Sequence, residues 1–198
     1  MAGSRTALVR AQAGMWRSLW WALRRRRAVG PGELALPYTS RIGVMLWVTI
    51  LLSPVEIVAV HLLLPWHVVR TVVLVVSLVS LVWMLGLTLA LQQRPHVLGP
   101  DRLVLRFAHL REVVVRVADV ADARAATTVD HPRTLEVGEG SVSLSVLGES
   151  SVRLRLEPGA TVLVDGAPVP AEQVTFFADD PRRAVRELRA RPAERALD

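Results

Sequence analysis

The hydrophobic positions divide the chain into two different halves. Residues 42–64 and 71–91 form two long apolar runs, whereas beyond residue 92 short segments alternate apolar and polar residues. A run of about 20 apolar residues matches the ~30 Å hydrocarbon core of a bilayer. In lipid, only a helix satisfies its own backbone over such a span. We therefore predict a transmembrane hairpin over residues 41–91, with helices at about 42–64 and 70–91.

A period of two predicts half-buried strands in the second half of the chain. Strands are expected around residues 103–107, 113–117, 142–146 and 152–156. Asp165-Gly166 is typical of a tight hairpin turn between two further strands, and Val174 to Ala178 adds the last one. The pattern thus predicts about six or seven short antiparallel strands.

A helix is predicted to close this β region. Asp179-Asp180-Pro181 combines an acidic N-cap with a proline that suits the first helical turn. We expect this helix over about 180–191, followed by a tail at 192–198. The predicted fold class is therefore an α+β membrane protein, with a transmembrane hairpin, an antiparallel β-barrel or sandwich over residues 95–191, and a C-terminal helix.

Residues 1–32 predict a basic amphipathic helix at the membrane surface. Trp16 and Trp20 share one helical stripe with two leucines. The consecutive residues Arg24, Arg25, Arg26 and Arg27 follow at its end. Such a helix can lie in the headgroup plane and attract anionic headgroups of membrane lipids. The same arginines equally fit a topology signal that packs on the protein, and both interpretations stay open.

The basic charge of the chain belongs to its first segment. All 24 basic residues are Arg and the net charge is +6, yet residues 1–41 alone hold eight Arg against one Glu. No basic stripe interleaved with aromatic residues follows, so we predict no nucleic-acid partner. Arginines flank the two apolar runs, whereas the link between them holds only Arg70. The positive-inside rule then predicts a multi-pass inner-membrane protein with both termini cytoplasmic.

Several short motifs occur in a characteristic order along the chain. They are Pro37-Tyr38, Val55-Glu56, His61-Leu62-Leu63-Leu64, Arg94-Pro95-His96-Val97, Gly99-Pro100-Asp101-Arg102-Leu103 and Phe176-Phe177-Ala178-Asp179-Asp180-Pro181. In this order the chain resembles small actinobacterial integral membrane proteins with a bacterial pleckstrin-homology-like (PH-like) domain. The resemblance covers roughly residues 37–190 and implies a fold and a membrane location, but no functional residues. Arg106-Phe107-Ala108-His109 departs from the Arg-x-Gly expected after the first strand.

Glu56 is the most informative single residue, because an ionisable group inside a membrane helix indicates a functional site. Counting from the link, Glu56 lies level with Ser77, and His61 lies level with Thr71. We therefore expect Glu56–Ser77 and His61–Thr71 contacts across the hairpin. Three roles stay open: a structural polar clasp that fixes packing, a proton or ion path, and a contact for a partner helix.

Catalytic and metal-binding patterns are missing from the sequence. The chain has no cysteine, and no HExxH, Gly-x-Ser-x-Gly or phosphate-binding glycine motif occurs. Arg153 and Arg155 share one strand face, which we interpret as solvated. We therefore expect no enzyme activity, no cofactor and no metal site.

The predicted function is a membrane-anchored, non-enzymatic scaffold or adaptor that presents the PH-like domain to the cytoplasm. Its partner would be an unidentified membrane or cytoplasmic protein, docked on a sheet edge or groove. Two alternatives are an accessory subunit of a transporter or other membrane complex that uses Glu56, and a lipid or surface-charge sensor that uses the N-terminal Trp/Arg helix.

Overall fold

The computed structural model describes residues 29–30, 32–108, 110–129 and 131–195. The chain forms two compact units. Residues 41–93 are the hairpin, and the described residues before 41 and after 93 form the β domain. Each unit is described by itself below.

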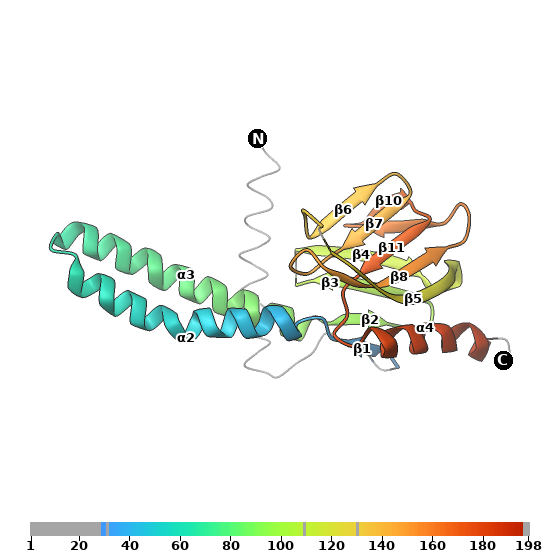
Figure 1. The fold of residues 1–198 in the computed structure, drawn as a ribbon, viewed down its shortest axis with the longest axis horizontal. Coiled ribbons are helices and arrows are strands. Elements are labelled where there is room, and N and C mark those ends of the chain that lie inside the picture. Colours follow the sequence, from blue (N-terminus) through green and yellow to red (C-terminus); the bar gives the residue numbers. More distant parts are fainter. Residues whose placement is uncertain (1–28, 31, 109, 130, 196–198) are drawn as a thin grey trace. The chain divides into compact units, whose positions relative to one another are not determined.

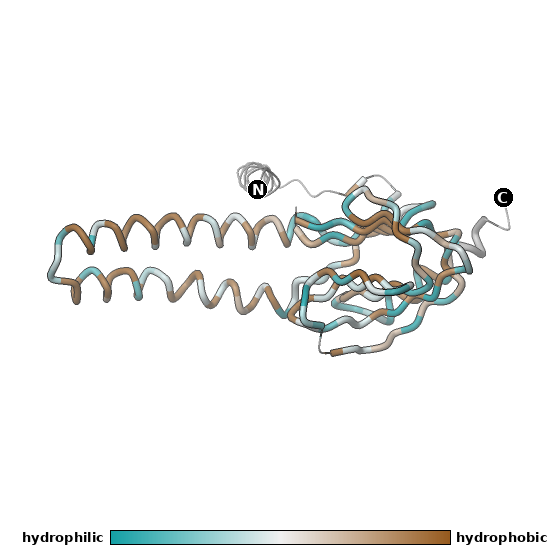
Figure 2. The backbone as a smooth tube through the Cα atoms, turned by 90° about the horizontal axis from the view of Figure 1, so that it is seen from above, coloured by the Kyte–Doolittle hydropathy of each residue, from teal (hydrophilic) through white to brown (hydrophobic). Residues whose placement is uncertain are grey.

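The hairpin consists of two long helices that run side by side (Figure 1), α2 (Ser40–Leu63) and α3 (His67–Gln93). Both lie within three residues of the predicted boundaries, and both are apolar along most of their length (Figure 2). Pro54 lies inside α2. Beside it, the Ser53 hydroxyl donates to the carbonyl oxygen of Thr49 at 2.8 Å.

One stripe of α2 is half-buried while most other positions are exposed. It repeats every three or four residues, comprises Leu46, Ile50, Ser53, Ile57 and Val60, and continues to Leu64 just after the helix. A matching stripe on α3 contains Val73, Ser77, Leu81 and Met84. Ile57 and Val60 line a small cavity with Val73, Leu74 and Ser77, so these stripes face each other there. This spacing of 3.5 residues is the packing period of a left-handed helix pair.

The β domain contains two sheets (Figure 1). The six-stranded sheet has the order β1 (Leu34–Leu36), β2 (His96–Leu98), β3 (Arg102–Phe107), β4 (Arg111–Arg116), β9 (Thr161–Val164) and β10 (Ala167–Pro170). The five-stranded sheet has the order β5 (Val120–Thr128), β8 (Ser150–Leu156), β11 (Gln173–Phe176), β7 (Ser141–Leu144) and β6 (Leu135–Gly138). A 3-10 turn, η1 (Val117–Asp119), leads from β4 into β5.

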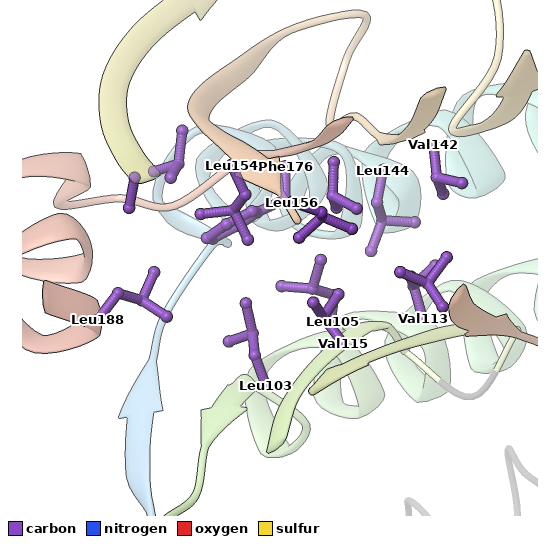
Figure 3. Close-up of a cluster of buried hydrophobic side chains, with 14 of the residues drawn as sticks. Leu103, Leu105, Val113, Val115, Val142, Leu144, Leu154, Leu156, Phe176 and Leu188 are labelled. Atoms are coloured by element: carbon purple, nitrogen blue, oxygen red, sulfur yellow. The ribbon is translucent and has the colours of Figure 1, made fainter. Parts of the chain in front are cut away.

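The core lies between the two sheets, as Figure 3 shows. Leu103, Leu105, Val113 and Val115 of one sheet face the residues of the other, and each is 0% exposed. The opposite residues are Val142, Leu144, Leu154, Leu156 and Phe176. Full burial of one such side chain contributes about 1.5–3 kcal/mol to folding. Burial of the inward-facing residues of the alternating strands therefore stabilises the face-to-face packing of the two sheets.

Helix α4 (Pro181–Arg195) adds Ala184 and Leu188 to this core and contacts β5, β8 and η1. Its start is as predicted, with the Asp180 carboxylate accepting from the Arg183 backbone N–H at 2.9 Å. Its predicted end near Arg191 is wrong, because the helix continues to Arg195 with Pro192 inside it. A proline removes a single backbone hydrogen bond, which the last turns of a helix tolerate better than its middle.

The strand prediction is incomplete. β3, β4, β7, β8, β9, β10 and β11 coincide with predicted segments, whereas β1, β2, β5 and β6 were missed. β1 also extends the β domain upstream of the hairpin, beyond the predicted start at residue 95. β5 (VADARAATT) is rich in Ala and carries charges at its outer positions, so it lacks the alternating pattern.

One strand pair contradicts the prediction of a purely antiparallel domain. β11 pairs antiparallel with β8 on one side and parallel with β7 on the other. β7 and β8 are joined by a tight turn at Val146–Glu149, so they run in opposite directions. Since β11 lies between them, it must be parallel to one of the two.

The tight turn between β7 and β8 places a leucine in a left-handed backbone conformation. Leu147 has φ +52° and Gly148 has φ +76°, while Val146 and Glu149 exchange both backbone hydrogen bonds. This conformation favours Asn-Gly and is unfavourable for a leucine. The Leu147 side chain is 58% exposed, so its burial does little to offset the cost of this backbone conformation.

We expect Leu147→Asn to raise the free energy of unfolding of the full chain by about 1 kcal/mol, because asparagine tolerates positive φ better than leucine. Urea denaturation in mild detergent, followed by circular dichroism, measures the change. Leu163→Asn is the matched control, since Leu163 is also exposed but lies within β9. An equal gain in both variants would contradict the role of the turn.

Candidate functional site

The residues that flank the hairpin in sequence meet inside the β domain. The rings of Tyr38 and His96 stack with a centroid distance of 4.3 Å, and His96 also meets the edge of Phe176 at 5.6 Å. Tyr38 is fully buried and His96 is 1% exposed. We call Tyr38, His96, Ala108, Phe177 and Asp179 the Tyr38–His96 cluster.

Both ring nitrogens of His96 are used. Nε2 lies 2.9 Å from the carbonyl oxygen of Phe177, and Nδ1 lies 2.9 Å from the backbone nitrogen of Arg106. The carbonyl can only accept and the backbone N–H can only donate. His96 must therefore be neutral, with its proton on Nε2. It ties β3 to the segment that follows β11.

Burial lowers the pKa of His96 from its usual 6.5 to about 3. The hydrogen bond to the Phe177 carbonyl opposes this shift, and the nearby charge of Arg106 adds to it. A proton on Nδ1 would also point at the Arg106 N–H, which already occupies that position. Protonation of His96 is thus incompatible with the folded cluster.

Tyr38 fixes the turn after β3. Its hydroxyl oxygen accepts a hydrogen bond from the backbone N–H of Ala108 at 2.9 Å, and burial raises the pKa of this hydroxyl to about 12. Ala108 has φ +50°, the left-handed conformation that favours glycine. Ala108 thus occupies the position where the Arg-x-Gly motif would have a glycine, which would adopt this conformation without strain. The hydrogen bond to the Tyr38 hydroxyl stabilises the alanine in this conformation.

Asp179 ties the start of the hairpin segment to the end of β11. Its carboxylate accepts from the backbone N–H groups of Thr39 and Ser40 at 3.0–3.2 Å and from the Ser40 hydroxyl at 2.6 Å. Its own backbone N–H donates to the carbonyl of Pro37 at 2.9 Å. The motifs at residues 37–38, 94–97 and 176–181 thus converge in one cluster, whose role is structural.

We expect the free energy of unfolding to fall by about 1.4 kcal/mol for each pH unit below 6.5, because unfolded His96 binds a proton that the folded protein excludes. The loss begins at the unfolded pKa and ends near the folded pKa of about 3. His96→Gln should be less stable at pH 7.5 and show a shallower slope between pH 6.5 and 4.5.

Urea denaturation of the full chain across this pH range is the measurement. His67→Gln is the control and should keep the wild-type slope, since His67 is exposed. If His96→Gln and the wild type showed equal slopes, His96 would not be the group that titrates.

The outer face of the five-stranded sheet is hollowed and polar. Two adjoining hollows of about 530 and 780 Å³ share Ser141, Arg153 and Gln173. The floor of these hollows consists of two rows of cross-strand partners, and each row takes one residue from every strand of the sheet. They are Arg124, Arg153, Thr175, Ser143 and Glu136, and Asp122, Arg155, Gln173, Ser141 and Gly138.

One end of the floor carries charges of both signs, since Arg124, Arg153 and Arg155 line this hollow together with Asp122, Glu139 and Glu172. Arg153 lies directly opposite Arg124 on β5, and Arg155 follows two residues along the same face of β8. Like charges on opposed positions destabilise a sheet. Asp122 offsets part of this charge, since it pairs with Arg124 and Arg189 and its pKa is lowered chiefly by the Arg124 hydrogen bond. Arg153 reaches the Thr128 hydroxyl at 3.2 Å.

At the other end His131 lies between an acid and two hydroxyls. Its Nδ1 is 3.1 Å from a Glu136 carboxylate oxygen, and its Nε2 is 3.2 Å from the Ser150 hydroxyl. Ser143 also contacts the ring and accepts from Thr175 at 2.9 Å. Sequence inspection missed this Ser–His–Glu connectivity, because the residues come from three separate segments.

This connectivity resembles that of a hydrolase triad, but the hydroxyl is out of reach. Ser150 is 0% exposed, so no substrate can approach its oxygen from the hollow. The contacts instead hold the segment around His131 against β6 and β8, with a backbone bond from His131 N–H to the Gly148 carbonyl. Among the described residues no three His, Asp or Glu side chains gather as metal ligands.

The polar residues predicted in the hairpin do not form the expected pairs. Ser77 and His61 line one small cavity of about 10 Å³ together with Arg70, whereas Glu56 does not line it. Glu56 is exposed on another side of α2, and the structure gives it no hydrogen bond or ion pair among the described residues. The Thr71 hydroxyl donates within its own helix to the His67 carbonyl rather than to His61. The structure therefore gives no Glu56–Ser77 and no His61–Thr71 hydrogen bond.

The membrane-surface residues Trp16, Trp20 and Arg24 to Arg27 lie outside the described part of the chain. Their predicted role stays a prediction.

Comparison with protein-family models, curated proteins and solved structures gives no match for this chain.

Proposed function

We propose that this protein is a membrane-anchored, non-enzymatic scaffold whose β domain holds a partner protein at the cytoplasmic face. The observation that carries the proposal is the contrast between its units. The hairpin exposes a continuous aliphatic surface, and the β domain presents a polar hollow.

The exposed surface of the hairpin supports membrane anchoring. Both helices are long and apolar enough to span a bilayer, and very few residues of their apolar stretches are buried. A core helix of a soluble protein would be mostly buried. Soluble monomers rarely expose contiguous apolar patches of more than a few hundred Å². Lipid is the solvent in which such a hairpin is stable. The distribution of arginines supports cytoplasmic termini.

The hollow on the five-stranded sheet is the proposed docking surface. Arg153 and Arg155 are exposed there beside the hydroxyls and amides of Ser141, Thr175 and Gln173. Arginine is enriched among residues that dominate binding energies, and it pairs with carboxylates in a bidentate way. We therefore expect a partner segment with acidic side chains that pair with Arg153 and Arg155, beside the acidic residues Glu139 and Glu172 that line the same hollow. Two packed sheets closed by a C-terminal helix also suit the PH-like resemblance.

An accessory-subunit role is the second candidate. The exposed position of Glu56 favours it, because the carboxyl is available to a neighbouring helix. The lipid-sensor hypothesis rests on residues outside the described part.

We expect Arg155→Glu to remove at least nine-tenths of a stoichiometric partner from the tagged full chain, because the charge reversal repels acidic groups in the hollow. The partner is measured by mass spectrometry after isolation from membranes in mild detergent at native expression. Arg182→Glu, an equal charge change on the exposed face of α4, should retain the partner.

Carbonate extraction of the same membranes tests the anchor separately, and the chain should stay in the pellet. Extraction into the soluble fraction would contradict the anchor. Equal partner recovery with both variants would contradict the docking surface.

A further inference from the structure

Each sheet of the β domain ends in two edge strands, which are β1 and β10 in one sheet and β5 and β6 in the other. The outward backbone groups of an edge strand can pair with another chain, so proteins usually block such edges. Among the described residues, three of these edges are blocked, each in a different way.

The edges of β1 and β5 are blocked by length and by a covering helix. β1 contains only three residues, Leu34–Leu36, and Pro37 follows it. β5 has two register shifts against β8, and α4 packs on it. There the Arg189 side chain donates from Nε to the Ala123 carbonyl oxygen at 3.1 Å. Short length, irregular register and a covering helix all hinder the addition of a strand.

The edge of β10 is blocked by proline. The backbone N–H of Ala171 donates to the Ala160 carbonyl, which fixes the residues of β10 that hydrogen-bond to β9. By alternation, Pro168 and Pro170 are the residues whose backbone faces outward. Proline has no N–H, so this edge cannot donate to an added strand.

β6 differs from the other edge strands, because its outward backbone groups are complete. The backbone N–H of Ser145 donates to the Thr134 carbonyl, so by alternation the backbone of Glu136 bonds to β7 and that of Leu135 and Val137 faces outward. Both outward residues have an N–H and a carbonyl. The structure gives these groups no hydrogen bond among the described residues.

An apolar side chain accompanies this open edge. Val137 lies directly opposite Val142, which is buried in the core, so Val137 is on the inner face of its sheet. It is nevertheless 52% exposed. Helix α4 contacts β5, at the opposite edge of this sheet, and covers the core there (Figure 1). A strand added beside β6 would therefore both pair with the open edge and cover Val137.

We propose that an extended segment of a partner protein adds to β6 as a further strand of the five-stranded sheet. This inference rests on the proposed function, because the segment belongs to the partner held at the hollow that β6 lines. In strand addition, main-chain hydrogen bonds supply affinity and alternate side chains supply specificity. The main-chain bonds here are those of Leu135 and Val137.

The inner face of β6 selects apolar side chains on the added segment. Leu135 and Val137 share this face, since residues two apart in a strand point the same way. Leu135 is half-buried and packs against the core, whereas Val137 is more exposed. The segment is therefore expected to carry apolar residues at two alternating positions.

The outer face of β6 selects a basic residue between these two positions. One carboxylate oxygen of Glu136 lies 3.1 Å from His131 Nδ1, and the other has no partner among the described residues. Arg133 also lines the hollow but precedes the strand. Opposite charges on facing strands stabilise a pair and like charges destabilise it, so we expect Arg or Lys opposite Glu136. A second copy paired through Leu135 and Val137 would instead set Glu136 against Glu136.

Defined peptides test strand addition on the full chain in mild detergent. One peptide has the repeat Thr-Val-Arg-Val, and its matched control has Thr-Val-Glu-Val. Hydrogen–deuterium exchange, followed by mass spectrometry, measures the backbone N–H groups of Leu135 and Val137. We expect the basic peptide to slow their exchange, and the acidic peptide to require an about five-fold higher concentration for the same protection.

Val137→Pro removes one outward N–H and no hydrogen bond to β7, so the domain should fold, which circular dichroism checks. It should weaken binding of the basic peptide about ten-fold, as expected for one lost hydrogen bond. Val137→Thr is the matched control, because it keeps the N–H and a β-branched side chain. It should bind the basic peptide within about three-fold of the wild type.

Three outcomes would overturn the inference. They are unchanged exchange at Leu135 and Val137 with both peptides, equal binding of the basic peptide to wild type and Val137→Pro, and equal binding of the two peptides. A disulfide-linked dimer of full-length Val137→Cys after mild oxidation of native membranes would assign the edge to a second copy instead. The native chain has no cysteine, so only this residue can form the bond.

Arg155→Glu separates this inference from the proposed function. Arg155 lies on β8, two strands away from β7 and three from β6, so the peptide should protect the β6 edge equally in this variant. Protection at β6 together with a partner that ignores Arg155→Glu would overturn only the docking surface in the hollow. A partner lost with Arg155→Glu, without protection at β6, would overturn only strand addition.

Discussion

The buried contact between Tyr38 and His96 is the constraint on which the β domain depends. These residues lie on either side of the hairpin in sequence, 58 positions apart, yet their rings stack in one core. Through them, the segment before α2 is fixed to β2, to the turn after β3 and to the end of β11. The hairpin is therefore an insertion into a domain that is built from both of its flanks.

Neutrality of His96 follows from this arrangement. A ring that must donate to one backbone carbonyl and accept from one backbone N–H has no place for a second proton. The cluster satisfies buried backbone groups that would otherwise cost about 1–3 kcal/mol each. The same logic explains Asp179, whose carboxylate receives the backbone N–H groups of Thr39 and Ser40 at the point where the chain enters α2.

The two units divide the chemistry of the chain. The β domain uses one face of each sheet for its core, which leaves the other face of the five-stranded sheet free to carry Arg153, Arg155 and a row of hydroxyls and amides. The hairpin uses one stripe of each helix for its own packing, which leaves Glu56 on the outside. In both units, the charged residues proposed to meet a partner, Arg153 and Arg155 in the β domain and Glu56 in the hairpin, lie outside the packed core.

The sequence determined the elements whose signal is local. Two apolar runs predicted α2 and α3, alternation and short apolar runs predicted about six or seven strands, and Asp165-Gly166 predicted the β9–β10 turn, because these features depend on neighbouring residues alone. Ala-rich β5 and the short β1, β2 and β6 were missed, since their strand character comes from pairing with partners distant in sequence.

Tertiary structure alone decided the parallel β7–β11 pair, the Tyr38–His96 stack, the grouping of His131 with Glu136 and Ser150, and the outward face of Glu56. Counting residues from the link placed Glu56 level with Ser77 but could not say which way either side chain points. That direction follows from which helix stripe packs on α3, a property of two helices together and not of either sequence run.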